Sequence, residues 1–328
     1  MATYQTSTPA RGIRESLADF IDHTSAEDVP IYTMASKGKI QNTFEEWQTD
    51  VVAAANKDNA IVEGADATYP TPTATTRLGN YVQTARKDFK IAAMLDIVKK
   101  AGRSTETKYQ SLMQGIALKT DVEAALCQNN AAVAPATGIA GKSASLETFA
   151  WAINNTASAT GAHGTGAPNG STTVVTGGAP TTAPVDASAT RALSEAMVKA
   201  TLSDGYSKGA RYKMAVMGPV QKQAFSALAG LASTRNNFST MKGKQGVILG
   251  AADVYVSDFG DVALVPSQFM RSKTILFIDP EGLEVKMGRR FAEEELAKTG
   301  DAEGRQIVTD FTLVVRNPRR IAKITDLT

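Results

Sequence analysis

The sequence is poor in the residues that usually build metal, redox and disulfide sites. Cys127 is the one cysteine in 328 residues, and His23 and His163 are the two histidines. A single cysteine excludes an internal disulfide and a cysteine-built zinc site, and two histidines are too few for a histidine-based metal centre. Aromatic residues make up 6% of the chain, which argues against stacking platforms for single-stranded nucleic acid. We therefore expect no metal and no cofactor.

Long hydrophobic runs and an excess of one charge are also missing. No stretch approaches the roughly 20 apolar residues that a membrane span needs, and residues 1–16 lack the apolar core of a secretion signal. The chain has 35 lysines and arginines against 33 aspartates and glutamates, a formal charge of +2. Any contact with DNA is thus expected to be non-specific. We expect a protein that contacts no membrane and acts in the reducing cytoplasm or a compartment continuous with it.

The composition itself is that of a folded protein. Hydrophobic residues make up 43% and charged residues 21% of the chain, which excludes global disorder. The length allows one large domain or two to three small ones.

The N-terminal part of the chain contains few core-forming side chains. Prolines and glycines interrupt residues 1–45, which predicts an extended arm with at most a short helix at about 14–21. Residues 46–95 predict a long two-stranded hairpin with a polar, turn-rich centre. An isolated hairpin is marginally stable. We therefore expect both segments to be stabilised by another subunit.

Residues 102–128 predict the clearest helix. Ser104 or Thr105 can cap its start, and Glu106 lies in the positive first turn. At 1.5 Å per residue the helix would be roughly 40 Å long, enough to span a domain. Its apolar residues recur at helical spacing, which predicts a stripe buried within the subunit; they are Tyr109, Leu112, Met113, Ile116, Leu118, Val122, Ala125 and Leu126. Cys127 at its end is expected to be a buried structural thiol.

The rest of the chain predicts a mixture of helices and short strands. Small and polar residues dominate 129–190, where one apolar helix is expected at about 145–154, followed by a low-complexity loop at 154–189. Residues 191–278 read as α/β, and 282–328 as further strands around a charged segment. In the helix that Pro219 opens, one face is expected to hold Val220, Ala224, Leu228 and Leu231.

Two short stretches match enzyme motifs incompletely. Residues 205–209 match a nucleophile elbow with Ser207 as the nucleophile, but the predicted helix and strand around it come in the reverse order. No histidine follows His163 to serve as the base. Residues 136–143 lack the first glycine of a phosphate-binding loop, and no hydrophobic strand precedes them. We expect no enzyme, and keep a serine hydrolase using Ser207 as an alternative.

The charged segment 289–305 mixes both signs. Such segments are usually solvated or pair with a neighbour, and this mixture suits an intersubunit ion-pair contact better than a metal site. The candidate contact residues are Arg289, Arg290, Glu293, Glu294 and Glu295. An arm, a long hairpin and a spanning helix are of little use to a monomer, but they suit a chain that interlocks with many copies of itself.

In this order of elements the sequence resembles the major capsid proteins of tailed double-stranded DNA bacteriophages. More narrowly, it is similar to a podovirus-type major head protein family. The resemblance covers nearly the whole chain, and the matching residues are EWQTD at 46–50, EG at 63–64, RLGNYVQ at 77–83, Tyr109, Gln110 and Glu123 on the long helix, and GRQIVTDFTLVVRNP at 304–318. Within the first and third motifs we expect Trp47, Asp50 and Arg77 to contact neighbouring subunits.

The resemblance implies an α+β protein with the lambdoid-type capsid fold. Its expected parts are an N-terminal arm (1–45), an extended β-hairpin loop (46–95), a peripheral domain with a long spine helix (96–134) whose strands return at 279–318, and an axial α/β domain (135–278) with a final strand at 319–328.

The resemblance further implies a major capsid protein that self-assembles as pentamers and hexamers into the icosahedral head around the phage genome, built in the host cytoplasm. The implied partners are copies of the chain, a separate scaffolding protein, a portal protein at one vertex, a decoration protein in some relatives, and packaged double-stranded DNA. The alternative of the same fold is the shell of a cargo-enclosing compartment.

Overall fold

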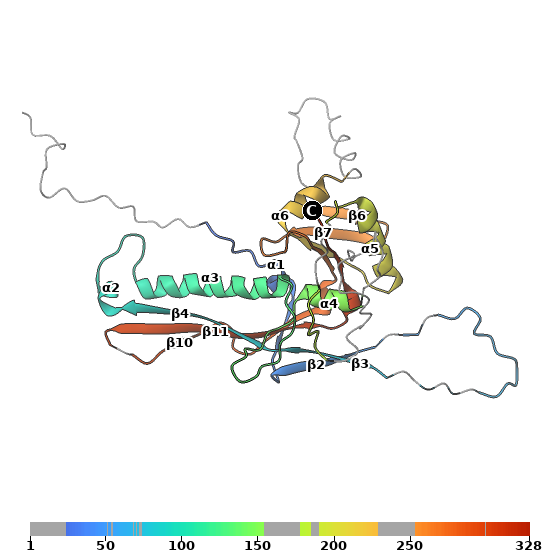
Figure 1. Ribbon diagram of the computed structural model, residues 1–328, viewed down its shortest axis with the longest axis horizontal. Helices are drawn as coiled ribbons and strands as arrows, with labels where there is room; N and C mark the ends of the chain where they lie inside the picture. Colours follow the sequence, from blue (N-terminus) through green and yellow to red (C-terminus); the bar gives the residue numbers. More distant parts are fainter. Residues whose placement is uncertain are drawn as a thin grey trace, which may run out of the picture.

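The computed structural model describes most of the chain in ten stretches. They are residues 24–50, 52–53, 55–67, 69, 71, 74–153, 178–184, 190–228, 253–298 and 300–328. His23, His163, the expected helix at 14–21 and most of the low-complexity stretch 154–189 lie outside these residues. The described chain is elongated, with a long helix and a narrow sheet extending to one side of a second sheet (Figure 1).

The first sheet has five strands, and the long helix α3 (Glu106–Cys127) packs against it. The strands are β1 (Ser36–Lys39), β4 (Gln83–Ala92), β9 (Leu283–Met287), β10 (Ala292–Glu295) and β11 (Ala302–Val315). Strand β11 is central: it pairs antiparallel with β4 and also with β9 and β10, and β1 adds to β9 in parallel. Figure 1 shows α3 running along β4 and β11.

The second sheet also has five strands, in the order β12-β8-β5-β7-β6. They are β5 (Met214–Met217), β6 (Val254–Ser257), β7 (Gly260–Pro266), β8 (Ile275–Ile278) and β12 (Ile321–Ile324). The last described strand, β12, pairs antiparallel with β8. Strand β6 is at the edge.

Two helices flank the second sheet. Helix α5 (Glu195–Ser207) begins where Ser194 accepts a hydrogen bond from the Met197 N–H, and Gly209, at φ +83°, follows its end. Helix α6 (Pro219–Ser226) begins with Pro219 in its first turn. The expected face of α6 is wrong at Val220, which is 52% exposed, whereas Gln221 and Phe225 are buried. Leu228 is buried as expected, and Leu231 lies outside the described residues.

The predicted two-stranded hairpin is present but shorter than the expected 46–95. Strands β2 (Phe44–Thr49) and β3 (Thr76–Tyr81) pair antiparallel, with Trp47 opposite Leu78. At the base of the hairpin, the buried Asn80 side chain donates to the Leu313 carbonyl at 2.8 Å and accepts from the Ala144 N–H at 2.9 Å. Strand β4 belongs to the first sheet, so the free part of the predicted loop ends before it.

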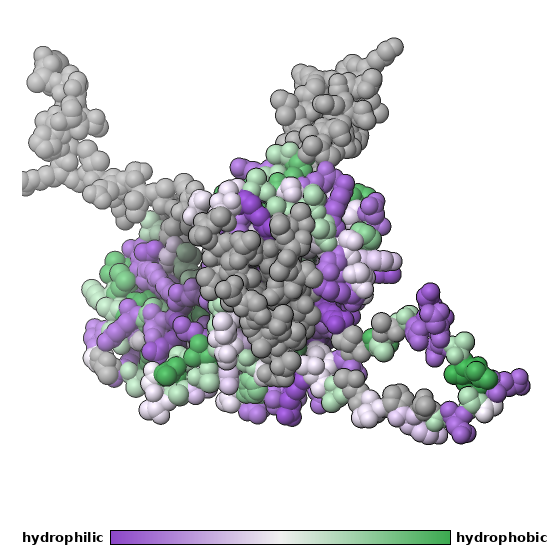
Figure 2. All heavy atoms as spheres, turned by 45° about the vertical axis from the view of Figure 1, so that its right-hand side comes forward, coloured by the Kyte–Doolittle hydropathy of each residue, from purple (hydrophilic) through white to green (hydrophobic). Residues whose placement is uncertain are grey.

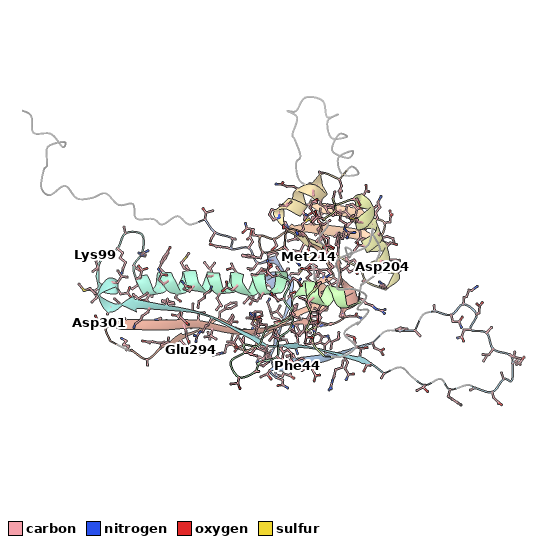
Figure 3. All side chains as sticks on the ribbon, viewed as in Figure 1. Phe44, Lys99, Asp204, Met214, Glu294 and Asp301 are labelled. Atoms are coloured by element: carbon pink, nitrogen blue, oxygen red, sulfur yellow. The ribbon has the colours of Figure 1, made fainter. Side chains whose placement is uncertain are left out.

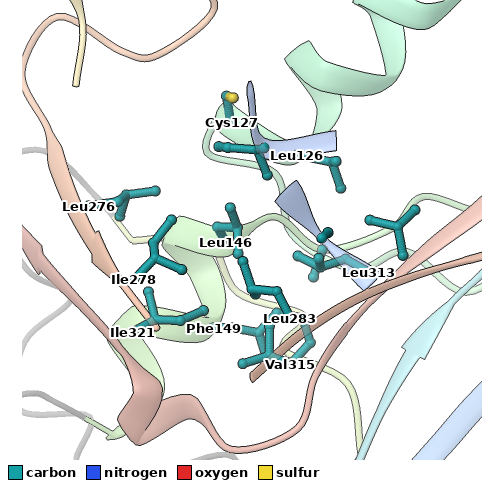
Figure 4. Close-up of a cluster of buried hydrophobic side chains, with 14 of the residues drawn as sticks. Leu126, Cys127, Leu146, Phe149, Leu276, Ile278, Leu283, Leu313, Val315 and Ile321 are labelled. Carbon is teal, nitrogen blue, oxygen red and sulfur yellow. The ribbon is translucent and has the colours of Figure 1, made fainter. Parts of the chain in front are cut away.

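One hydrophobic core joins the two sheets. Helix α4 (Leu146–Ile153) lies in this core. Figure 4 shows side chains from α3, α4 and both sheets meeting there, among them Leu126, Leu146, Phe149, Ile278, Leu313 and Ile321. Cys127 is buried as expected, and burial raises the pKa of its thiol.

The expectation that residues 1–45 lack core residues is wrong for 29–39. Helix α1 (Pro30–Met34) places Ile31 in the core with no exposed surface, and Ala35 is 3% exposed. Strand β1 then pairs with β9. The few apolar side chains of this segment pack against elements that are more than 80 residues away in the sequence. Local sequence patterns carry no information about such distant contacts, so the sequence did not predict this packing.

The expected stripe of the long helix is buried only in its C-terminal half. Leu118, Val122 and Leu126 are fully buried, whereas Leu112 is 63% exposed. The N-cap Thr105 makes no capping bond with its side chain. Instead Asp96, in the short helix α2 (Ala93–Ile97), accepts a hydrogen bond of 2.8 Å from the Glu106 N–H at the start of α3. The remaining short elements are the 3-10 turns η2 (Pro280–Gly282) and η3 (Pro318–Arg320).

Candidate intersubunit surfaces

The described residues contain neither a helix long and apolar enough to cross a membrane nor a cluster of three metal-binding side chains. Ser207 is the last residue of α5, and its hydroxyl donates to the Asp204 carbonyl at 2.7 Å. This Ser207 geometry is that of a helix end followed by a turn and the strand β5, not of a serine exposed between a strand and a helix.

The hairpin positions the first group of candidate contact residues. Trp47 is half-buried and its ring lies 5.9 Å from the ring of Phe149, so it packs mainly on its own chain. Arg77 is exposed on β3, with its Nε 3.5 Å from an Oε1 of Glu46 on the facing strand. Asp50 is exposed directly after β2. Arg77 and Asp50 are thus on the outer surface, and Trp47 anchors the hairpin.

Beyond its two strands the hairpin continues into a loop that contacts little of its own chain. Every described residue between Asp50 and Thr75 is exposed. The apolar side chains are among them: Val52 is 95%, Ile61 85%, Val62 79% and Tyr69 92% exposed. Figure 2 shows hydrophobic and hydrophilic residues side by side along this protruding loop. Exposed apolar groups in a contiguous projection are typical of an interaction site.

In the second group of candidates, Glu293, Glu294 and Glu295 lie on strand β10, and several members of the group are paired within the chain. Arg305 Nη1 lies 2.9 Å from Glu293 Oε1, and the Ser111 hydroxyl donates to Glu293 Oε2 at 2.7 Å. These hydrogen bonds, the first from Arg305, lower the pKa of Glu293. Gln306 donates to Glu294 at 2.7 Å. Glu294 lies on this strand beneath α3, away from the second sheet (Figure 3).

The same segment contains a bidentate ion pair. Arg289 Nε and Nη2 donate to the two carboxylate oxygens of Asp310, at 2.8 and 3.1 Å. Hydrogen bonding to Asp310 raises the pKa of Arg289. Arg290 and Glu295 are exposed, and the negative charge of Glu295 contributes to raising the pKa of Lys298 and of Arg305 in the same chain. The sequence pattern did not reveal these partners, because they depend on the register of β10 with β11.

A buried carboxylate fixes the point at which the arm leaves the body. Glu123 on α3 is fully buried, and its two oxygens accept hydrogen bonds from the N–H groups of Ile31 at 2.9 Å and Tyr32 at 2.7 Å. Burial raises the pKa of Glu123, and the two hydrogen bonds oppose that change. Helix α1 is thereby tied to the long helix. The family resemblance drew attention to Glu123, but no sequence rule indicated its partners.

Sequence reasoning missed a second exposed apolar surface, at the far end of the first sheet. In and after α2, Met94 is 64%, Leu95 46%, Ile97 77% and Val98 51% exposed. The four apolar residues at 94–98, which surround Asp96 and are followed by two lysines, were a usable signal. The predicted boundary between the hairpin loop (46–95) and the peripheral domain (96–134) divided this run.

Comparison with known proteins gives a consistent result. The SU10 major capsid protein family matches residues 1–328. The major capsid protein of Escherichia phage Phieco32 is 32% identical over 120 residues, which are 37% of this chain and 34% of that relative. The match therefore spans about a third of the length of this curated relative.

The fold is also that of solved capsid structures. The capsid asymmetric unit of cyanophage A-1(L) has a TM-score of 0.66 at 12% identity, over 99% of this chain and 100% of that chain. The capsid of a native GTA particle, computed with C5 symmetry, has a TM-score of 0.60 at 14% identity, again over 99% and 100%. A solved chain from Gordonia phage Cozz matches with a TM-score of 0.58 at 12% identity, over 99% of both chains.

These findings confirm the expected class: an α+β protein with the fold of tailed-phage capsid subunits. The chain belongs to the SU10 major capsid protein family. By that membership it is a phage major capsid protein, part of the virion.

Proposed function

We propose that copies of this chain assemble as pentamers and hexamers. In these assemblies the hairpin loop between β2 and β3 docks on an adjacent subunit and so holds the subunits together. The observation that carries this proposal is the complete exposure of the described loop residues, including Ile61, Val62 and Tyr69. Left in water, these side chains stabilise nothing. Covered by a neighbour, each large apolar side chain contributes roughly 1.5–3 kcal/mol before ordering costs.

The division of the chain into parts belongs to the same proposal. A peripheral domain is formed by 96–134 and 279–318, and an axial domain by 135–278 and 319–328. The two five-stranded sheets support this division. Strands β1 and β4 belong to the first sheet. The parts of the arm and of the loop that lie outside the sheet are therefore shorter than 1–45 and 46–95.

Further contacts between subunits are proposed at exposed charges and at α2. Asp50, Arg77, Arg290 and Glu295 have exposed positions that suit contacts with a neighbour. The apolar surface at residues 94–98 would be covered in the same way. Three other candidates in the charged segment have partners in their own chain: Arg289, Glu293 and Glu294. We propose that they shape the surface of that segment and that they do not provide its main ion pairs with a neighbour.

Partners other than copies of the chain are also proposals. A decoration protein is supported by phage G, whose structure of gp27 major capsid proteins includes gp26 decoration proteins and shares this fold with a TM-score of 0.53 at 10% identity. A separate scaffolding protein, a portal protein and non-specific contact with packaged double-stranded DNA are what the assembly of a tailed-phage head implies. Assembly is proposed to occur in the host cytoplasm.

The role is structural rather than catalytic in this proposal. The family match supports it, and so does the position of Ser207 at a helix end. The same match favours a phage head over a cargo-enclosing compartment of the same fold.

Electron microscopy of the expressed chain tests the proposal. With the scaffolding protein co-expressed, we expect closed shells from the natural chain and from a control with Asp58→Ser and Asn59→Ser. The double variant Ile61→Ser, Val62→Ser, in the same loop, should remain folded as free subunits but form few closed shells. Equal shell yields from the two variants would refute the docking role of the loop.

A further inference from the structure

Three cationic side chains from separate parts of the chain surround the ring of Tyr32 in α1. Lys37 on β1 has its Nζ 3.4 Å from the centroid of the Tyr32 ring and also donates to the Tyr32 carbonyl. Lys119 on α3 has its Nζ 5.9 Å from the same centroid. Arg290 directly precedes Phe291, whose ring lies 6.0 Å from that of Tyr32. Segments that are distant in the sequence thus bring three positive charges to one place.

These charges are close enough to act on one another. Burial lowers the pKa of Lys37 to about 8. The carboxylate of Glu123 opposes this change, whereas the positive charges of Lys119 and Arg290 add to it. Burial raises the pKa of the Tyr32 phenol, and the charge of Arg290 opposes that rise. Positive groups that repel one another in this way are stabilised by an anion placed between them.

The carboxylates nearby are already in use. Glu123 is the carboxylate that acts on Lys37, and its two oxygens accept hydrogen bonds from main-chain N–H groups of α1. Asp121, on the same helix, pairs with Lys87 at 2.7 Å. Three positive charges against one negative leave a local excess of +2, as large as the formal charge of the whole chain. One carboxylate would neutralise half of it, whereas a DNA backbone presents successive phosphates.

We propose that Lys37, Lys119 and Arg290 form a binding site for the phosphate backbone of double-stranded DNA. Ammonium and guanidinium groups are the usual partners of phosphate oxygens, and contacts of this kind carry no base specificity. The inference rests on the proposed function for the presence of packaged DNA, and it names the residues that contact it. Arg290 is also a candidate for contacts between subunits, so the test variants leave it unchanged.

Removing one charge on the long helix tests the site. Binding of a short fluorescent duplex by free, full-length subunits is followed by anisotropy over a series of salt concentrations. Lys119→Gln should weaken binding at ~50 mM salt at least about fivefold, and lower the slope of log affinity against log salt by about 1.

Lys108→Gln is the matched control, because Lys108 is exposed on the same helix, 11 residues before Lys119. It loses the same charge outside the cluster and should change the affinity less than about twofold. Equal effects of the two variants would overturn the proposal, and so would failure of the natural chain to bind the duplex.

The titration of Lys37 gives a second readout that a general loss of charge would not produce. Its ammonium loses its proton as the pH rises through about 8, while DNA phosphates stay charged. From about pH 7 to about pH 9, duplex binding by the natural chain should weaken at least about threefold more than binding by Lys37→Arg, which stays charged. The groups that face Lys37 are the same in both proteins; they are Tyr32, Glu123, Lys119 and Arg290. Equal pH dependence would overturn the proposal.

Two further measurements separate DNA from other ligands. Inorganic phosphate should displace the duplex no more than chloride does at equal ionic strength. Stronger displacement would make this a site for free phosphate and overturn the proposal. Electron micrographs of Lys119→Gln should show the shell yield of the natural chain. A loss of shells with unchanged duplex binding would assign the cluster to a contact between subunits, and would also overturn it. Absence of shells from the natural chain would instead contradict the proposed function.

Discussion

The carboxylate of Glu123 on the long helix accepts a hydrogen bond of 2.9 Å from the main-chain N–H of Ile31, 92 residues earlier in the chain. The other carboxylate oxygen accepts from Tyr32, and the whole side chain is buried. A short helix of five residues cannot hold itself together. Its position, and with it the origin of the arm, is held by these hydrogen bonds together with the burial of Ile31 in the core.

Replacing Glu123 should therefore destabilise the subunit in a graded way. Glu123→Ala leaves two buried N–H groups without an acceptor and opens a cavity, and we expect a loss of about 3 kcal/mol in the free energy of unfolding. Glu123→Gln keeps the volume and one acceptor, and should lose about 1 kcal/mol. Urea unfolding of free subunits measures both. Equal losses would show that the two hydrogen bonds do not fix α1.

The pH dependence of stability should carry the signature of the same group. Burial raises the pKa of Glu123 above its ordinary value of 4.5. Between 4.5 and the raised pKa, the folded chain binds more protons than the unfolded chain, so the contribution of Glu123 to the free energy of unfolding falls as pH rises. Urea unfolding from pH 4.5 to about 7 should show this fall in the natural chain relative to Glu123→Gln. The opposite sign would contradict the assignment.

Proline in the middle of the long helix should prevent folding. Ile116→Pro removes a main-chain donor and clashes with the preceding turn, at a cost of about 3 kcal/mol or more, and we expect insoluble protein. Ile116→Ala is the control and should stay soluble, because this side chain lines an open groove rather than the core. A soluble, native-like proline variant would mean that α3 is not one continuous helix.

A buried ion pair should matter more than an exposed one. Arg271 Nη1 donates to both carboxylate oxygens of Glu147, at 2.9 and 3.0 Å, and the Glu147 side chain is 1% exposed. Glu147→Ala leaves the largely buried Arg271 without this partner, and we expect a loss of about 3–5 kcal/mol. The control Glu195→Ala removes an exposed pair with Lys199 and an acidic residue from the first turn of α5, and should cost much less than Glu147→Ala. Similar losses in thermal or urea unfolding would refute the distinction.

Truncations of the arm should separate the free part from the packed part. Removing residues 1–23 should leave a folded subunit. Removing residues 1–40 should not, because it deletes Ile31 from the core and β1 from the sheet. Circular dichroism and solubility measure the difference. A native-like subunit lacking residues 1–40 would contradict the packing of α1.

Local patterns were sufficient for most elements of the fold. The long helix, the hairpin and the strands at 214–217, 275–278 and 283–287 have strong periodicity or apolar runs bounded by turn residues, so the sequence predicts them. The packing of Ile31 and the burial of only half of α3 were not predictable, because both depend on partners far away in the chain.

The contact surfaces were harder to predict than the fold. Charge near charge in the segment 289–305 suggested contacts between subunits. Yet the register of β10 against β11 places Glu293 beside Arg305 within one chain. The exposed apolar side chains at 94–98 were missed because a short segment with four apolar residues, interrupted by Asp96, fits a strand as well as a helix. Composition cannot distinguish an ion pair within a chain from one between chains.

Hydrogen exchange on free subunits and on assembled shells tests the central claim, that the hairpin loop docks on a neighbour, most directly. The amides of residues 55–67 should exchange fast in free subunits, where every one of these residues is exposed, and slowly in shells. The C-terminal half of α3 should be protected in both states, since Leu118, Val122 and Leu126 are fully buried. Equally fast exchange of residues 55–67 in both states would contradict the account.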